Sequence, residues 1–317
     1  MGIMGQPLDR KLAFFYGQFV DGAYAMYERD PHNLTPEPQT GDIPDTFEMV
    51  AWIDMSDFIL WDKVPKFYGI MARNRVYRHE YIVAIRGTKT LMEWADDAFA
   101  LLTPFKPVPD AGRVAKGFDQ IYSSLQVVKR RGVPTIPPPT PAAVAPAPVA
   151  SLQAVPHERM SGTFAEQLEQ LADSLESDES RQGFATGKIA RPPRGMIVTG
   201  HSLGSALATL FVIENKDRKK FDITTSCTFA SPRVGDAEFV RRFDEFPITS
   251  WRIVNTQDLV PRIPFHIPLF FPYEHVNTEY DFSSAGVVKW NPVCWHSMKT
   301  YLHWLDPASE LDANCKK

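Results

Sequence analysis

One nine-residue stretch, residues 196–204, restricts the possible folds of this chain more than any other. It opens with an apolar run, residues 196–198, which has the composition of a buried strand. The stretch that follows it, residues 205–213, contains neither proline nor glycine and favours a helix. Between the two, Gly200 and Gly204 lie two residues on either side of Ser202. A Gly-x-Ser-x-Gly pattern in this setting predicts an α/β fold in which a sharp strand-to-helix turn exposes the serine.

A serine in such a turn needs a base and an acid before it can act as a nucleophile. Residues 253–258 read as an apolar strand that ends in a polar turn, with Asp258 at its end and Pro261 shortly after. Open α/β sheets carry functional groups at the carboxyl ends of their strands, so Asp258 is the predicted acid. Four later histidines are candidates for the base: His266, His275, His296 and His303. Position just before a predicted C-terminal helix favours His296, and His275 is its main competitor.

Five segments resemble, in the same order, motifs of the fungal-type (class 3) triacylglycerol lipases. They are residues 85–88 with Trp94, Asp97, Gly117 and Phe118, then residues 200–204, 228–239, 252–264 and 296–301. This resemblance covers residues 81–118 and 196–305. It implies a single α/β-hydrolase domain, with a mostly parallel sheet flanked by helices. It also implies that Ser202, Asp258 and His296 form a catalytic triad, and that His275 is structural.

The resemblance and the chemistry of acyl transfer together predict an oxyanion hole. Attack by Ser202 would place negative charge on a carbonyl oxygen, which preorganised N–H groups stabilise. One donor is expected to be the backbone N–H of Leu203, at the start of the helix after the turn. The second is expected to be Thr88, directly after Gly87 at the end of a predicted strand. Departures from the family's usual residues concern substrate fit: Lys116, Ala230 and Asp236.

The activity that the resemblance implies is hydrolysis of carboxylic esters through an acyl-enzyme on Ser202, with acylglycerols favoured and no cofactor. Phospholipase A1 or feruloyl-type esterase activity on the same triad is one alternative. A catalytically silent, lipase-like interaction protein, with a proline-rich segment as its docking element, is another. Two apolar stretches, residues 90–109 and 263–272, are candidates for an acyl pocket or a lid. The first begins with a capping box at residues 90–93, which predicts a short helix.

Composition excludes several other classes of protein. The chain has 317 residues, of which 44% are hydrophobic, enough for a large core. A net charge of −4 and an isoelectric point near 6.1 do not favour nucleic-acid binding. No apolar run approaches the roughly 18 residues of a membrane span.

Residues 134–156 are rich in proline and alanine. This composition predicts an extended surface insertion within one domain.

Cysteine and histidine usage gives no metal-ligand spacing, so no metal site is expected. The three cysteines, Cys227, Cys294 and Cys315, allow one disulfide and leave one thiol over, and Cys227 lies in a predicted core strand.

Residues 12–20 read as an amphipathic helix rather than a signal peptide, which favours a cytoplasmic location or export without a signal. Residues 162–177 predict a second amphipathic helix. The oligomeric state and chain-length preference cannot be read from the sequence.

Overall fold

The computed structural model describes most of the chain: residues 6–56, 64–88, 101–131, 157–181, 193–265, 272–276 and 278–317. Some of the sequence-based expectations lie outside these residues: the capping box at residues 90–93, residues 90–100 of the first candidate lid, residues 266–271 of the second, and the insertion at residues 134–156.

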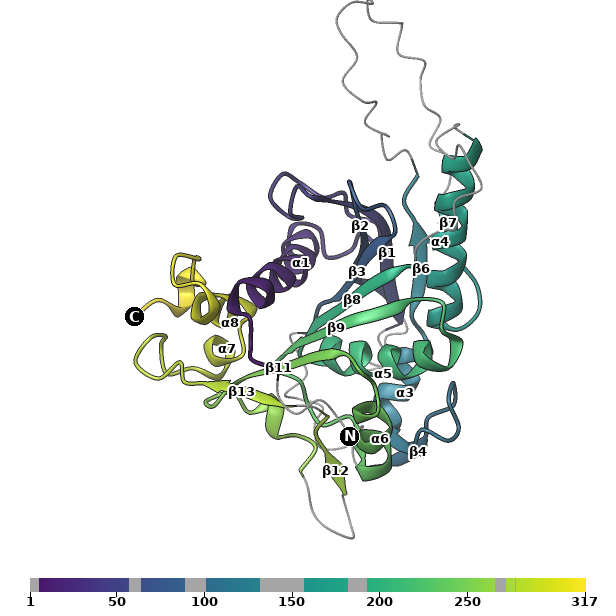
Figure 1. The fold of residues 1–317 in the computed structure, drawn as a ribbon. Helices are drawn as coiled ribbons and strands as arrows, with labels where there is room; N and C mark the ends of the chain where they lie inside the picture. Colours follow the sequence, from purple (N-terminus) through teal and green to yellow (C-terminus); the bar gives the residue numbers. More distant parts are fainter. Residues whose placement is uncertain are drawn as a thin grey trace, which may run out of the picture.

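A nine-stranded sheet forms the centre of the molecule (Figure 1). Its strands, in sheet order, are β13 (Glu279–Phe282), β11 (Thr249–Asn255), β9 (Asp222–Phe229), β8 (Gly195–His201), β3 (Glu80–Ile85), β2 (Pro65–Asn74), β1 (Phe47–Ser56), β6 (Gln126–Lys129) and β7 (Glu158–Arg159). The strands from β13 to β3 run parallel to one another. The strands from β3 to β7 pair antiparallel. The parallel part carries the predicted strand-turn-helix unit at its centre.

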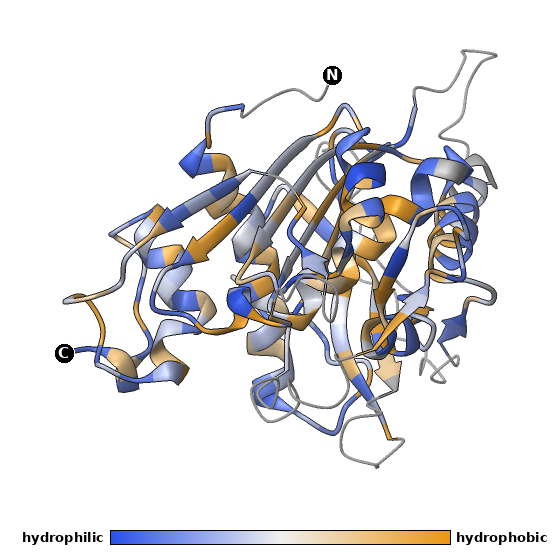
Figure 2. Ribbon diagram, turned by 90° about the horizontal axis from the view of Figure 1, so that it is seen from below, coloured by the Kyte–Doolittle hydropathy of each residue, from blue (hydrophilic) through white to orange (hydrophobic). Residues whose placement is uncertain are grey.

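Helices cover both faces of this sheet, as expected for an α/β-hydrolase fold (Figure 1). One face packs against α1 (Arg10–Arg29) and α8 (Met298–Leu305), and the other against α3 (Lys116–Tyr122), α4 (Phe164–Arg181) and α5 (Leu203–Arg218). Successive strand residues alternate between the two cores: Ile82 and Ala84 face α1, whereas Val83 and Ile85 face α5. Figure 2 shows the most hydrophobic segments along the central strands and the helices beside them. The helices predicted at residues 12–20, 162–177 and 205–213 are therefore confirmed as parts of α1, α4 and α5.

A small antiparallel sheet lies beside the large one. It consists of β12 (Tyr273–Glu274), β10 (Gly235–Asp236), β5 (Arg113–Ala115) and β4 (Leu102–Pro104). Asp236 joins it to α6 (Ala237–Asp244), because its carboxylate caps that helix at the N–H of Phe239 and also binds the side chain of Arg113 at 2.9 Å. This departure from the family's usual residue thus has a structural role.

Strands on both sides of the proline- and alanine-rich segment belong to one sheet. β6 precedes the segment and β7 follows it, and the two pair directly, with Val128 opposite Arg159 and Lys129 opposite Glu158. The chain therefore leaves and re-enters the sheet at adjacent strands, at the edge remote from β8.

Gly204, the second residue of α5, is the closest contact between that helix and the sheet. A Cβ atom placed on it would lie 2.1 Å from the carbonyl oxygen of Ile85 in β3, and that neighbour is backbone. A glycine-to-alanine change within a helix ordinarily raises stability by roughly 0.5–1 kcal/mol. We expect Gly204→Ala to do the opposite and to lower the free energy of unfolding by more than 1 kcal/mol, measured by urea denaturation. A variant as stable as the wild type would contradict this close packing.

Candidate active site

Ser202 lies at the turn between β8 and α5, in a backbone conformation that few non-glycine residues adopt. Its φ and ψ are 60° and −127°, which costs on the order of 1–3 kcal/mol. The turn is held by the N–H of Ser202, which donates to the carbonyl of Phe229 at 2.9 Å. It also needs Gly200, since a Cβ there would lie 2.4 Å from the carbonyl oxygen of Gly204. The two glycines of the motif are therefore required by backbone packing.

The structure brings the three predicted triad residues together. Nε2 of His296 lies 2.8 Å from Oγ of Ser202, and its Nδ1 lies 2.7 Å from Oδ2 of Asp258. Ser202 and Asp258 are almost fully buried, whereas the His296 side chain is 17% exposed. β8 and β11 are parallel and separated by β9, so their carboxyl ends deliver the serine and the aspartate to the same edge of the sheet. This is the arrangement in which an imidazole can take a proton from a serine hydroxyl.

Two further donors fix the Asp258 carboxylate. The backbone N–H of Val260 donates to Oδ1 at 3.0 Å, and the Tyr301 hydroxyl donates to Oδ2 at 2.7 Å. Burial, and then the nearby Asp258 charge, raise the pKa of Tyr301 well above its ordinary value, so the phenol stays protonated. Because both oxygens are held, Asp258 can orient His296 in one position.

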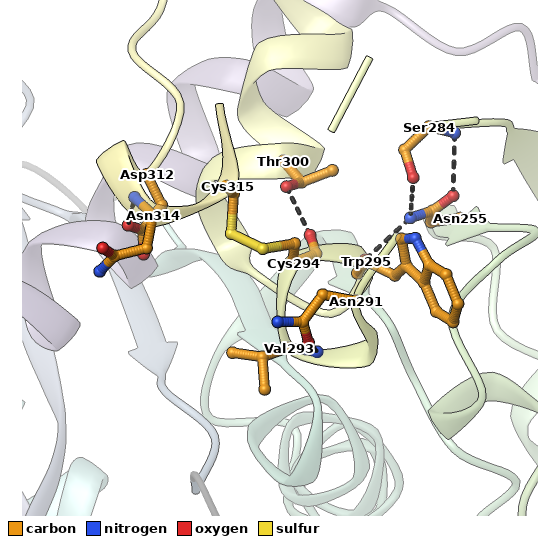
Figure 3. Close-up of a disulfide and its surroundings, with 10 residues drawn as sticks. All are labelled: Asn255, Ser284, Asn291, Val293, Cys294, Trp295, Thr300, Asp312, Asn314 and Cys315. Atoms are coloured by element: carbon orange, nitrogen blue, oxygen red, sulfur yellow. Dashed lines mark hydrogen bonds between the residues drawn. A yellow bond between two sulfur atoms is a disulfide. The ribbon is translucent and has the colours of Figure 1, made fainter. Parts of the chain in front are cut away.

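His296 directly follows the short helix α7 (Pro292–Trp295). Figure 3 shows how two residues of this helix, Cys294 and Trp295, are anchored. Two residues before it, Cys294 forms a disulfide with Cys315, which lies in the C-terminal turn η2 (Ala313–Cys315). The side-chain amide of Asn255, at the end of β11, donates to the Trp295 carbonyl at 2.8 Å. The disulfide thus ties the loop to the chain's C-terminal residues, and Asn255 ties it to the sheet.

The predicted oxyanion residues both lie beside the serine. Leu203 is the first residue of α5, so its N–H belongs to the helix start that has no intrahelical acceptor. Thr88 directly follows Gly87, and a Cβ on Gly87 would lie 2.6 Å from the Cβ of Ser202. The Gly87 N–H in turn donates to the hydroxyl of Tyr24, from α1, at 2.7 Å. The backbone that leads to Thr88 is thus held against the serine.

Arg86 also holds the backbone of Gly87 in place, and its side chain is only 2% exposed. Its guanidinium donates to the carbonyl of Gly87 at 2.8 Å and to that of Phe67 at 2.6 and 3.0 Å. Its Cζ also lies 3.5 Å from the ring centroid of Tyr27 and 4.3 Å from that of Tyr68. Carbonyl oxygens and aromatic faces therefore compensate this buried cation.

His201 precedes the serine and is a second, buried imidazole next to the predicted base. Its ring centroid lies 4.6 Å from that of His296, and its Nδ1 lies 2.8 Å from the Tyr24 hydroxyl. Tyr24 also accepts the Gly87 N–H, so its hydroxyl links the His201 ring to the backbone at the end of β3. Burial, and then the proximity of His296, lower the pKa of His201 well below its ordinary value. A neutral His201 adds no charge that would oppose a proton on His296.

The other two candidate bases in the described part of the chain make structural contacts. His275 lies with Nε2 2.7 Å from the Pro261 carbonyl, and His303 lies with Nδ1 2.8 Å from the Ser309 carbonyl. His266 lies outside the described residues. The position of His275 agrees with the structural role that the resemblance implies for it.

Within the described ranges, no group of three or more His, Cys, Asp or Glu side chains is arranged to hold a metal ion. Over the same residues, no helix is both long and apolar enough to cross a membrane. Cys227, buried in β9, is a free thiol, and burial raises its pKa above the ordinary value.

The pKa of His275 is lowered to about 3, first by burial and then by Arg252 and Arg233. Between about pH 3 and 6.5 the unfolded chain therefore binds a proton at this site that the folded protein does not, so acidification lowers stability. We expect His275→Asn to reduce the loss of unfolding free energy between pH 7 and pH 5 by about 2 kcal/mol, measured by urea denaturation. Equal losses in the variant and the wild type would contradict a neutral, buried His275.

Comparison with known proteins agrees with this geometry. The model of the family "Lipase (class 3)" matches residues 82–267, more than half of the chain. A rice protein named phospholipase A1-II 1 is 26% identical over 283 residues, which cover 83% of this chain and 60% of the rice protein. A secreted mono- and diacylglycerol lipase of Fusarium solani is 35% identical over 118 residues, 37% of this chain and 32% of that protein. The chain thus spans less than two thirds of the length of these relatives.

Solved structures of fungal lipases share the fold. The Rhizomucor miehei lipase in its propeptide complex aligns with a TM-score of 0.52 and 18% identity, over 87% of this chain and 69% of that one. A structure described as a triacylglycerol lipase whose catalytic centre is a serine protease triad aligns with a TM-score of 0.53 and 18% identity, over 87% of this chain and 81% of that one. These alignments confirm the α/β-hydrolase fold. With the family match over more than half of its length, the chain belongs to the class 3 lipase family.

Proposed function

We propose that the protein is a serine hydrolase of carboxylic esters that acts on acyl lipids. One observation carries this proposal: Ser202, His296 and Asp258 form a continuous hydrogen-bonded chain with distances of 2.8 and 2.7 Å. The serine stands at a turn between a strand and a helix N-terminus, where N–H groups can stabilise an oxyanion. An intact chain of this kind argues against a silent interaction protein.

The reaction follows from these positions. His296 takes the proton of Ser202 as Oγ attacks the ester carbonyl, and Asp258 stabilises the resulting imidazolium. The N–H of Leu203 and the Thr88 segment hold the oxyanion. When the tetrahedral intermediate collapses, the ester C–O bond breaks and the alcohol leaves with the proton from His296. Water, activated by the same imidazole, then releases the fatty acid and restores Ser202.

Acylglycerols are the substrate we favour, and phospholipids are the second candidate. A fungal relative and a solved structure with the same fold are described as lipases of mono- and diacylglycerol and of triacylglycerol. The observation for a phospholipase A1 is that the rice and Arabidopsis relatives of that name match more than 80% of the chain. Fatty-acid release from emulsified triacylglycerol and from phosphatidylcholine vesicles, measured side by side, separates the two.

The test of the general activity is the serine itself. Ser202→Ala should fold normally but lose about 10⁴–10⁶ in kcat on a soluble p-nitrophenyl ester, because the nucleophile is gone. His296→Ala should lose nearly as much, because the two residues act as a unit. A fluorophosphonate probe should label the wild type and neither variant. Ester turnover of Ser202→Ala within tenfold of the wild type, or a wild type that the probe does not label, would overturn the proposal.

Tyr301 tests the support of the acid. Tyr301→Phe keeps the ring but removes one of the donors to Asp258, at a cost of about 1–1.5 kcal/mol. We expect kcat on the soluble ester to fall roughly tenfold with little change in KM. The matched control is Tyr280→Phe, whose hydroxyl bonds to the Gln6 carbonyl and touches no triad residue. Equal turnover in the two variants would show that this hydrogen bond does not support catalysis.

A further inference from the structure

Residues 285–293, which follow β13 and include the first two residues of α7, form an apolar projection that the triad does not use. Eight of these nine residues are exposed, and only Val288 is buried. Three large apolar side chains face outward: Trp290 is 81% exposed, Val293 74% and Val287 45%. Tryptophan is rarely exposed to this degree in a folded protein, and an exposed apolar group of this size usually marks an interaction site.

The projection is held in place rather than loose. At its start, the Ala285 N–H donates to the side chain of Gln257 at 3.2 Å. In its middle, the Lys289 N–H donates to the Cys315 carbonyl at 3.0 Å. At its end, Asn291 caps α7, and the disulfide follows at Cys294 (Figure 3). The apolar side chains are therefore presented in a fixed arrangement, which lowers the entropy cost of binding.

The projection lies next to the predicted base. Val293 is in α7, three residues before His296, so the two side chains lie on the same side of one helical turn. The Trp290 ring packs edge to face on the Trp295 ring, with 4.8 Å between the ring centroids, and Trp295 directly precedes His296. Leu259, beside the predicted acid, is also 40% exposed. A surface that bound the projection would therefore approach the edge of the sheet where the triad lies.

Three exposed lysines lie close to these apolar side chains, either next to them in the chain or across a backbone bridge. Lys289 is adjacent to Trp290, and the bridge between Val288 and Lys316 brings the exposed Lys316 and Lys317 beside it. Among the residues that the structure describes, none of these lysines has an ion-pair partner. Asp312 is the acidic residue nearest to Lys316 in the sequence. Its carboxylate accepts the N–H of Asn314 and so caps the turn η2. Tryptophan with neighbouring lysines matches the headgroup region of an anionic lipid layer, where both are favoured.

We propose that residues 285–293 dock the protein on an anionic lipid–water interface, with Trp290 and Val293 entering the headgroup region and the lysines facing lipid phosphates. The choice of lipid as occupant rests on the proposed function. It also rests on the charge around the tryptophan and on the position of the projection beside the triad. Docking would hold the lipid surface at the mouth of the site without any change in the triad.

Binding can be measured without turnover in the Ser202→Ala background, by sedimentation with vesicles of phosphatidylcholine and phosphatidylglycerol. Trp290→Ala should weaken binding roughly tenfold or more, because apolar area no longer enters the interface. The control is Tyr77→Ala, since Tyr77 is 58% exposed in the turn before β3, at the other end of the sheet. It should bind as the parent does. Quenching of Trp290 by acyl-brominated lipid, taken as the difference from Trp290→Phe, reports insertion directly.

The lysines give a second arm. Lys289→Gln and Lys316→Gln should each weaken binding by roughly fivefold, and the effect should vanish with vesicles of phosphatidylcholine alone. Equal binding by Trp290→Ala and its parent, or no quenching, would overturn the proposal. So would a dimer in light scattering that Trp290→Ala dissociates while vesicle binding persists, which would assign the surface to a second copy. Soluble-ester turnover, measured separately with Ser202 intact, decides the proposed function independently of this result.

Discussion

The contact between the strand-to-helix turn and β3 is the constraint on which the rest of this site depends. Cβ atoms on Gly87, Gly200 or Gly204 would each lie within 2.6 Å of neighbouring heavy atoms, so side chains at these positions are excluded by contact distances alone. That packing forces Ser202 into its positive-φ conformation. It also places the end of β3, which leads to Thr88, against the start of α5. Nucleophile and predicted oxyanion donors are thus positioned by backbone that cannot move independently.

The base is held in a different way, because His296 does not belong to the sheet. A four-residue helix has little stability of its own. Its order comes from the Asn255 amide, from the Cys294–Cys315 disulfide and from the Asp258 carboxylate.

The sequence predicted the parts of the site that are encoded locally. The turn at Ser202 is visible because glycine spacing, an apolar run and a helix-forming run meet within one short segment. Asp258 could be identified because it lies in the polar turn that follows an apolar strand. Spacing alone left His296 and His275 as competitors, and the family resemblance favoured His296, which is the one that contacts Ser202.

The residues that the sequence did not identify act across long separations. Tyr24 lies 177 residues from His201, and nothing in the amphipathic pattern of α1 distinguishes its hydroxyl from any other on that helix. The antiparallel strands from β2 to β7 carry no motif, so their place in the sheet depended on tertiary pairing. Three cysteines allow three pairings, and only the fold shows that Cys294 and Cys315 meet. Arg86 was the one residue whose role the sequence could have indicated. An arginine at the end of an apolar strand is expected to be buried, and its charge then needs polar or aromatic partners.

One short helix therefore serves two surfaces. Its C-terminal end presents His296 to Ser202, and its outer face presents Val293 beside Trp290. The disulfide that anchors the predicted base also fixes the apolar projection, because Cys294 lies between Val293 and His296. Ser202 and the segment that leads to Thr88 belong to the sheet and its strand-to-helix turn. A surface that binds the projection would therefore contact the protein near His296 and not at this turn. Because the turn is rigid and His296 is anchored separately, the docking surface and the reaction site can lie side by side.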